Sequence, residues 1–336
     1  MNQIRILFLN LFIMNILFSI GLAACSQSTQ VPLDVAHVPV SVIYETDFTF
    51  DVDDVGALAV LHALADNGEA EILAISYNEV QSRAADAIDA INTWYGRGDI
   101  PIGLYDKPLA APDYLHSFYI DKLAGMRNNI TDNTVDSSLN VYKEVLSEQP
   151  DHSVTIISVG FLNNLYDLLV EEPALVAQRV DKLVLMGGVY YDEFNFVRHD
   201  LVEQTQYVFE NWPTPIIVSQ EGEYIKTGAA LEDTPEDNPV RQAYYAWFGN
   251  TFQDRSSWDQ VAVLYGVRGN SSYFEEIDTG NGQLSNGFQW KMEPGRRMYL
   301  VNKLPTTEMA KIIEALMVQP PMSGLFGGDC GRAINR

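Results

Sequence analysis

The sequence is poor in basic residues. Its 336 residues include 21 Lys and Arg against 45 Asp and Glu, which gives a formal net charge of −24. A nucleic-acid polymer is bound through clustered cations that neutralise its phosphates, so this shortage of cations excludes a nucleic-acid polymer as partner. The abundant carboxylates are instead the ligands that hard divalent cations prefer.

Low-complexity stretches and internal repeats are also missing, which argues against a disordered or repeat protein. With 47% hydrophobic and 11% aromatic residues, the chain is long enough to bury a large core. Beyond the first 24 residues, no apolar run has the length needed to span a bilayer.

Cysteine is nearly absent, with only Cys25 and Cys330. A basic Arg5 precedes an apolar run over 6–22 that contains no acidic residue, and the sequence Leu-Ala-Ala-Cys ends at Cys25. This segment resembles the signal peptide and lipobox of bacterial lipoproteins, in which the Cys is lipidated. It predicts a signal peptide over 1–24, a lipid on Cys25 and a tether over 25–40 that leads to a folded domain over 41–336.

This resemblance implies an exported protein that faces the periplasm or the cell surface and touches the membrane only through its lipid anchor. Two alternatives remain: an uncleaved N-terminal membrane anchor, and a plain signal peptide with Cys25 unmodified. If Cys25 carries lipid, Cys330 has no partner, so no intramolecular disulfide is expected even in an oxidising compartment.

Apolar, β-branched segments alternate along the chain with segments of helical periodicity. This alternation predicts a single Rossmann-like α/β domain with a mostly parallel sheet and helices on both faces. In such sheets, ligands bind beyond the carboxyl ends of the strands. The expected strands are 40–44, 71–76, 101–104, 154–159, 182–188 and 215–219, and the expected helices are about 53–66, 83–95, 164–171 and 201–211.

Four carboxylates crowd the junction between the first strand and the first helix. Asp47, Asp51, Asp53 and Asp54 lie within eight residues. Like charges this close repel or shift each other's pKa, whereas Ca²⁺, which takes six to eight oxygen ligands, makes the arrangement favourable. The alternative is a solvated acidic loop that caps the helix.

The segment 46–58 resembles the N-terminal aspartate motif of the inosine-uridine-preferring nucleoside hydrolases. The usual motif has one Asp, three intervening residues and then an Asp pair, whereas this chain carries two extra residues and the additional Asp51. Asp47 and Asp51 are therefore both candidates for the first metal ligand, and Asp47 is favoured because it lies at the strand end. Glu45 stands where the family has a further Asp.

Later segments match the same family in the expected order, from about residue 41 to 265. The resemblance implies that Asn78, Glu193 and Asn195 contact the ribose and that Met186 lies beside the sugar. Taken singly, most of these residues read as turn or core residues. Their order, and their position after predicted strands, favour the functional interpretation.

The resemblance also implies a calcium site. Its protein ligands would be Asp47 or Asp51, Asp54, the distant Asp259 and the backbone carbonyl of Asn163, which stands where the family usually has Thr. Asp53 would then be the general base that activates water for attack on an oxocarbenium-like sugar. A bound calcium can hold that water and the sugar hydroxyls together as a template.

The leaving-group side of the predicted site departs from the family. Trp258 replaces the usual His beside the last Asp. Trp258 could activate the departing base by stacking, or Tyr190, Tyr191 or His199 could approach it from a loop.

The sequence therefore predicts a calcium-dependent N-glycosyl hydrolase that converts ribonucleosides or related ribosides to ribose and free base. The alternatives are a non-catalytic, calcium-containing nucleoside- or sugar-binding lipoprotein, and a hydrolase of a different glycoside. A homo-oligomer is compatible with the sequence, and the base preference is left open.

Overall fold

Strand β1, Val40–Thr46, lies in the middle of a nine-stranded sheet. Val42, Ile43 and Tyr44 are fully buried because helices cover both faces of the sheet at this strand. The strand order is β4-β3-β2-β1-β5-β6-β7-β13-β10, and every neighbouring pair is parallel except β13 and β10. The other strands of the sheet are β2 (Ala70–Tyr77), β3 (Ile102–Leu104), β4 (Asp136–Ser137), β5 (Val154–Ser158), β6 (Val180–Met186), β7 (Ile216–Ser219), β10 (Phe274–Ile277) and β13 (Arg297–Asn302).

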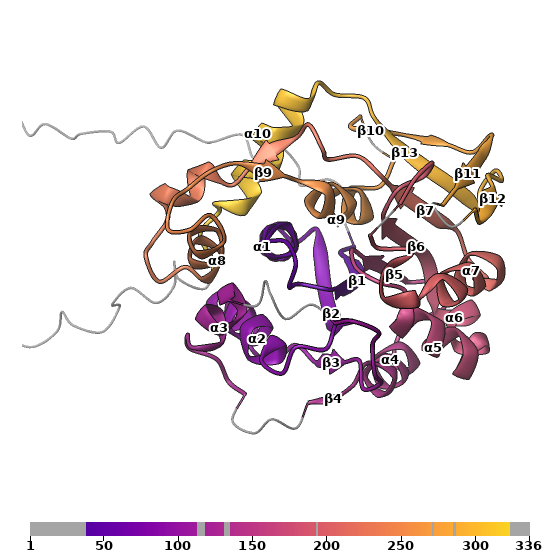
Figure 1. Ribbon diagram of the computed structural model, residues 1–336, viewed down its shortest axis with the longest axis horizontal. Coiled ribbons are helices and arrows are strands. Elements are labelled where there is room, and N and C mark those ends of the chain that lie inside the picture. The colour runs from indigo at the N-terminus through magenta and orange to yellow at the C-terminus, as the bar shows by residue number, and fades with distance from the viewer. Residues whose placement is uncertain are drawn as a thin grey trace, which may run out of the picture. The chain divides into compact units, whose positions relative to one another are not determined.

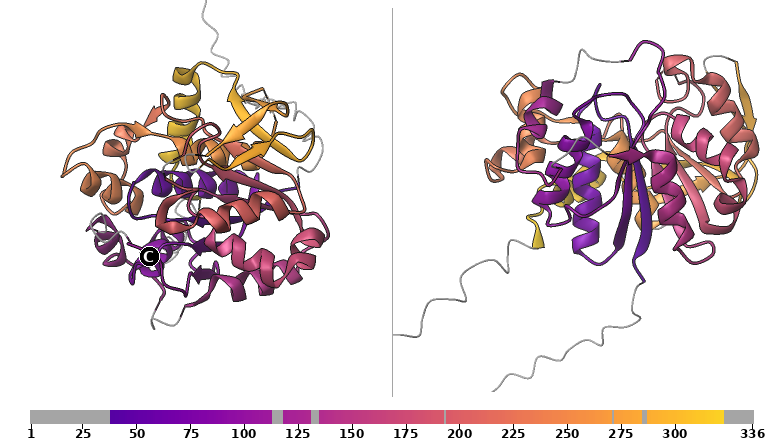
Figure 2. Two further views of the ribbon diagram at one scale, coloured as in Figure 1. Left: turned by 45° about the vertical axis from the view of Figure 1, so that its right-hand side comes forward. Right: turned by 90° about the horizontal axis from the view of Figure 1, so that it is seen from below.

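Two helical layers enclose this sheet, each with its own cluster of buried apolar side chains (Figure 1). One layer comprises α1 (Asp53–Asp66), α2 (Ala84–Trp94), α3 (Phe118–Ala124), α8 (Pro239–Trp247), α9 (Trp258–Arg268) and α10 (Thr306–Met317). The opposite layer comprises α4 (Ser138–Ser147), α5 (Asn163–Glu171), α6 (Pro173–Arg179) and α7 (Val202–Asn211). Figure 2 shows the central strands β1 and β2 between these layers.

Smaller elements complete the chain. Two short antiparallel pairs join β8 (Lys226–Thr227) to β9 (Arg255–Ser256), and β11 (Asn281–Gln283) to β12 (Gln289–Lys291). Two 3₁₀ turns span Arg198–Asp200 and Ala229–Asp233. No helix in the described part of the chain is long and apolar enough to cross a membrane.

The computed structural model describes residues 38–112, 118–130, 135–192, 194–270, 272–284 and 287–322. The predicted signal peptide, Cys25, the tether up to residue 37, Glu193 and Cys330 lie outside these residues, as does the C-terminal tail from 323.

The sheet has a topological switch point between β1 and β5. From β1 the chain proceeds outward through β2, β3 and β4, and then returns to β5 on the other side of β1. The loops that follow β1 and β5 therefore leave in opposite directions and open a crevice at the carboxyl edge. Asp47 directly follows β1, and Val159 directly follows β5. The fold thus places the aspartate cluster at the position where such sheets bind ligands.

Helix α1 is buried on nearly all sides, because α9 packs against it as well as the sheet. Gly56 makes this approach possible, since a Cβ there would lie 2.4 Å from Gln260 Nε2 of α9 and 2.5 Å from Tyr244 Oη of α8. The close packing brings the first turn of α1 next to the first turn of α9. Asp53, Asp54 and Asp259 belong to these two turns.

The fold class predicted from the sequence is confirmed. Each expected strand and helix is present, and most of their ends agree within two residues: the helix expected over 201–211, for example, is α7, Val202–Asn211. The short strand β4, strands β8 to β13 and helices α3, α4, α6 and α8 to α10 were not predicted. Buried α9 illustrates why, because it is apolar on most of its surface and shows no helical alternation of polar and apolar residues.

His62 in α1 gives a prediction for stability. The side chain is fully buried, stacks on Tyr95 with ring centroids 4.5 Å apart, and pairs its Nε2 with Asn92 Oδ1 at 3.0 Å. Burial, together with the nearby positive charge of Arg97, lowers the pKa of His62 from 6.5 to about 3. Between these two values the unfolded chain binds a proton that the folded protein does not bind, so this residue makes stability fall as the pH falls.

We expect His62→Gln to flatten this acid dependence. The wild-type free energy of unfolding should fall more steeply below pH 6.5 than that of the variant, by about 1.4 kcal/mol per pH unit. Urea denaturation of both proteins between pH 7 and pH 4 measures the difference. Parallel pH profiles would show that His62 is protonated in the folded protein.

Candidate active site

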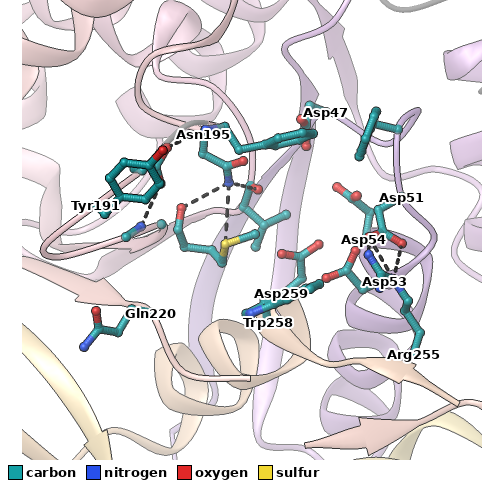
Figure 3. A pocket seen from close by; sticks show the side chains of 17 residues that line it. Asp47, Asp51, Asp53, Asp54, Tyr191, Asn195, Gln220, Arg255, Trp258 and Asp259 are labelled. Carbon is teal, nitrogen blue, oxygen red and sulfur yellow. Dashed lines mark hydrogen bonds and ion pairs between the residues drawn. The ribbon is translucent and has the colours of Figure 1, made fainter. Parts of the chain in front are cut away.

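A cavity of about 410 Å³ opens at the carboxyl edge of the sheet. Its walls come from the segments that follow β1, β5, β6 and β7 and from the start of α9 (Figure 3). One part is acidic and another is aromatic, so the cavity suits a ligand with a polar end and a flat apolar end. The described lining residues are Asp47, Phe50, Asp51, Asp53, Asp54, Val159, Met186, Gly187, Gly188, Tyr191, Asp192, Phe194, Asn195, Gln220, Arg255, Trp258 and Asp259.

Three carboxylates converge on the acidic part of the cavity. Asp53, Asp54 and Asp259 each offer an oxygen, and these oxygens lie within 4.8 Å of one another. All three residues are less than 5% exposed. Asp53 Oδ2 and Asp259 Oδ1 have no hydrogen-bond partner among the described residues. Such buried oxygens are costly unless a cation or a proton compensates them.

The pKa values of these three carboxyls are raised, as expected for buried acidic groups that no cation compensates. Burial, reinforced by the neighbouring carboxylates, raises the pKa of Asp53 and of Asp259 well above the ordinary value of a carboxyl. Burial also raises the pKa of Asp54 to about 7, although the Thr46 hydroxyl and the Phe48 N–H both donate to its Oδ1 and favour the carboxylate. Without a cation, the cluster therefore holds protons at pH values where ordinary carboxyls are ionised.

Asn195 forms the wall opposite the carboxylates. Its amide nitrogen donates to the carbonyl of Val159 at 2.6 Å and to the carbonyl of Met186 at 3.1 Å, and lies 3.6 Å from Met186 Sδ. These contacts use the nitrogen and fix the orientation of the amide. The Asn195 oxygen is left as a hydrogen-bond acceptor for a ligand hydroxyl in the cavity.

Arg255, Asp51 and Trp258 form a third wall. Arg255 Nε lies 3.0 Å from both carboxylate oxygens of Asp51, and Nη2 also donates to Asp51. The guanidinium lies over the Trp258 ring, 5.1 Å from its centroid. Asp51 and Arg255 thus form an ion pair that stacks against an aromatic side chain beside the acidic cluster.

The sequence from residue 42 to residue 257 matches the model of a known family, the inosine-uridine preferring nucleoside hydrolases. The chain belongs to this family. The resemblance inferred from the aspartate motif is therefore confirmed, and the protein is an N-glycosyl hydrolase of the nucleoside hydrolase type that acts on ribonucleosides. No curated protein matches the sequence.

Solved structures share the fold of this nucleoside hydrolase at low sequence identity. The type III effector XopQ complexed with adenosine diphosphate ribose is 14% identical with a TM-score of 0.64, and the match covers 85% of this chain and 94% of the effector. The plant nucleoside hydrolase PpNRh1 is 16% identical with a TM-score of 0.60, covering 84% and 100%. A purine-preferring ribonucleoside hydrolase from Gardnerella vaginalis is 14% identical with a TM-score of 0.57, covering 83% and 98%.

Asp47 and Asp51, the two candidates for the first metal ligand, occupy different environments in this nucleoside hydrolase. Asp47 is 7% exposed and makes no ion pair with Arg255. Burial raises its pKa well above the ordinary value of a carboxyl. Asp51 is instead held by Arg255. Neither belongs to the trio of converging carboxylates, although both line the cavity. The Asp51 oxygens are thus already engaged by an ion pair with Arg255, which Asp47 does not make.

Asn78 and Asn163 lie behind the cavity rather than on its described surface. Asn78 donates to the Phe161 carbonyl at 2.7 Å, and Asn163 donates to the Asn78 carbonyl at 2.9 Å. Gly160 permits this arrangement, since a Cβ there would lie 2.6 Å from Asn78 Oδ1 and 2.7 Å from the Asp47 nitrogen. The two asparagines therefore link the loop after β2 to the loop after β5, directly beneath Asp47.

The remaining predicted site residues fall into two groups. Met186, Asn195, Trp258 and Tyr191 line the cavity, whereas Tyr190 and His199 do not. Tyr190 is 56% exposed and donates to the Tyr299 hydroxyl at 3.2 Å. His199 is buried, with Nδ1 2.7 Å from the Ala110 carbonyl oxygen and Nε2 3.0 Å from Glu79 Oε2. Tyr191 is thus the loop residue that can reach a ligand.

Glu45, which replaces an Asp of the family motif, does not line the cavity. It is fully buried behind Asp47, and Tyr142 donates to its Oε1 at 3.1 Å. Burial raises the pKa of Glu45 to about 8, so this side chain is protonated at neutral pH. Glu45 is therefore a neutral hydrogen-bonding residue near the C-terminal end of β1.

Asp192 is a cavity residue that the sequence did not single out. Its carboxylate accepts the backbone N–H groups of Gly188 at 2.7 Å, Phe194 at 2.9 Å and Phe196 at 3.0 Å. These bonds fold the segment that carries Asn195 into a compact turn. The sequence offered one indication, an Asp four residues after a Gly-Gly pair, which is typical of turns that use a side chain as acceptor.

We expect Asp192→Ala to lower kcat/KM for ribonucleosides on the order of 100-fold, because displacement of Asn195 spoils the alignment of the sugar. Asp192→Asn keeps one acceptor oxygen and should give an intermediate loss. Steady-state kinetics of both variants measure the effect, with Asp237→Ala on the exposed surface as control. Unchanged kinetics in Asp192→Ala would show that Asn195 holds its position without this residue.

The donor set fits a metal ion of the kind that the family uses. Asp53, Asp54 and Asp259 supply only oxygens, two of which lack protein partners, and the unusually high pKa values reflect uncompensated charge. A divalent cation would lower this electrostatic cost, because it supplies positive charge at the place where the carboxylates converge.

Proposed function

We propose that this nucleoside hydrolase is calcium-dependent and cleaves the N-glycosidic bond of ribonucleosides or related ribosides, releasing ribose and free base. The observation that carries the proposal is the trio of buried carboxylates from α1 and α9, which lines the same cavity as Asn195 and Trp258. The acidic part suits a cation and a sugar, and the aromatic part suits a base.

Calcium is the proposed ion because all the available donors are hard oxygens. Among the described residues that line the cavity there is neither His nor Cys, the ligands that zinc and the softer metals prefer. Asp53, Asp54 and Asp259 would hold the ion, and Asp47, which lines the same cavity, is the candidate for a further ligand. When bound, calcium would supply a template for the sugar hydroxyls and would acidify water.

The side chains around the ion would divide the reaction between them. Asp53 would take a proton from the attacking water as the oxygen bonds to the anomeric carbon. The Asn195 oxygen would accept a sugar hydroxyl and, together with Met186, hold the ring in place. The carboxylates would also stabilise the positive charge that develops on the sugar.

We also propose that the protein is exported and anchored to a bacterial membrane by lipid on Cys25. The support is the sequence of the N-terminal segment, an apolar run that ends in Leu-Ala-Ala-Cys. Labelled palmitate supplied to expressing cells should enter the wild-type protein and not Cys25→Ser. Equal labelling of the two proteins would contradict the anchor.

The proposed reaction is tested by release of free ribose from a panel of purine and pyrimidine nucleosides. The protein from residue 26 onward should release ribose with calcium and not with chelator. The same panel establishes the base preference. Ribose release that is unaffected by chelation would contradict calcium dependence, and release from none of the nucleosides would point to a different glycoside.

A further inference from the structure

Arg255 is the only cationic side chain among the described residues that line the cavity, and no His lies among them. Hydrolysis of an N-glycosidic bond leaves negative charge on the departing base, which needs a proton or a positive donor nearby. The family His that stands next to the last Asp is replaced here by Trp258. Arg255, which lies against that tryptophan, is therefore the cationic group available to replace the His.

We propose that Arg255, held by Asp51 and stacked on Trp258, stabilises the departing base by hydrogen bonding as the N-glycosidic bond breaks. This role rests on the proposed hydrolysis of ribosides and assigns a residue to the stabilisation of the leaving group in that reaction. Asp51 acts as the positioning residue for Arg255, which explains why the longer loop after β1 carries an additional Asp.

The hydrogen bonds of the guanidinium leave donors for a ligand. Nε and one N–H of Nη2 are directed to Asp51. Nη1 has no hydrogen-bond partner among the described residues, and the side chain is 32% exposed. An arginine has five N–H donors in a fixed plane, so Arg255, anchored to Asp51 through one edge, keeps the N–H groups of Nη1 available to a ligand of the cavity that it lines.

The surroundings fix this donor firmly. The Asp51 side chain is 13% exposed, its Oδ1 also accepts the Val52 N–H at 2.7 Å, and its carbonyl accepts the Tyr119 hydroxyl at 2.6 Å. On the other side, the Trp258 ring lies against the guanidinium. A base bound in the cavity would therefore meet a donor whose orientation is already set.

The step balances without any other reactant. The water oxygen bonds to the anomeric carbon, one water proton passes to Asp53, and the electron pair of the broken C–N bond stays on the base nitrogen. Arg255 donates hydrogen bonds to the base and keeps its own protons, because a guanidinium does not deprotonate in a protein. The released base then takes a proton from solvent.

The test compares two substrates that differ in their leaving group. Inosine needs stabilisation of its departing base, whereas 4-nitrophenyl β-D-ribofuranoside releases an anion that is stable by itself. We expect Arg255→Met to lower kcat for inosine about 100-fold and kcat for the nitrophenyl riboside less than about threefold. Arg255→Lys, which keeps a charge, should recover part of the loss with inosine.

Arg241→Met is the matched control, because Arg241 also stacks on an aromatic ring, Phe252 at 4.6 Å, but lies outside the cavity. An equal loss on both substrates in Arg255→Met would overturn the inference while leaving the proposed hydrolysis intact, since damage to the sugar or water side slows both reactions. A wild-type protein that cleaves neither substrate would overturn both proposals.

Asp51→Asn tests the positioning role separately. We expect a smaller loss than in Arg255→Met, again larger for inosine than for the nitrophenyl riboside, with calcium affinity measured by titration calorimetry unchanged. Reduced calcium affinity with equal losses on both substrates would instead make Asp51 a metal ligand and overturn its role towards Arg255.

Discussion

Replacing Asp53 with Asn is expected to lower the rate of ribose release on the order of 10³-fold, because the amide cannot take a proton from the attacking water. The same change should raise the melting temperature of the metal-free protein at pH 8. Burial raises the pKa of Asp53, so its carboxylate opposes folding at that pH, and a neutral isostere removes the opposition.

These opposite effects separate catalysis from structural damage. Ribose release and calorimetric melting of the same protein preparations measure them, with the exposed Asp237→Asn as the control for the chemical change. A variant that loses both activity and stability would show that Asp53 is a structural residue. A variant that keeps wild-type turnover would remove Asp53 as the base.

Chelation of calcium is expected to abolish ribose release and to destabilise the protein, more strongly at pH 8 than at pH 5. The pKa of Asp54 is about 7 in the folded protein against an ordinary 3.8, and those of Asp53 and Asp259 are also raised. Between these values the metal-free folded protein binds more protons than the unfolded chain, so its stability falls as the pH rises. Bound calcium would counteract this loss by compensating the charge of the carboxylates.

Calorimetric melting at pH 5 and pH 8, with calcium and with chelator, measures this effect. A free calcium concentration of a thousand times its dissociation constant corresponds to about 4 kcal/mol of stabilisation. Asp259→Asn should weaken calcium binding and reduce the pH dependence of the metal-free protein. If calcium stabilises the protein equally at both pH values, the trio is not the site of binding.

The parts of the fold that the sequence predicted are those with strong local signals. Strand β5 is a run of buried β-branched residues, and α7 has a clear apolar face, so both were located within one or two residues. The C-terminal strands β11 and β12 are only three residues long and pair with each other away from the main sheet. Their conformation depends on tertiary contacts that no short window of sequence records.

The same distinction applies to the site. The clustering of Asp53 and Asp54 is visible locally, and the family motif then pointed to Asp259. The ion pair between Asp51 and Arg255 joins residues from opposite halves of the chain, and neither residue carries a local sign of the other. Sequence alone therefore left Asp51 as a candidate metal ligand beside the favoured Asp47, whereas in the structure its carboxylate pairs with Arg255.

The contact between α1 and α9 at Gly56 has a consequence for folding. Two of the three converging carboxylates are made early in synthesis and the third late, so a nascent chain that lacks α9 cannot complete the trio. Capture of an ion by the trio would thus be an event of the nearly complete chain, after the strands on both sides of β1 have assembled. The ion would then cross-link two segments that are distant in sequence, and it would do so late in folding. Its loss would first destabilise the packing of α9, which forms part of the cavity wall.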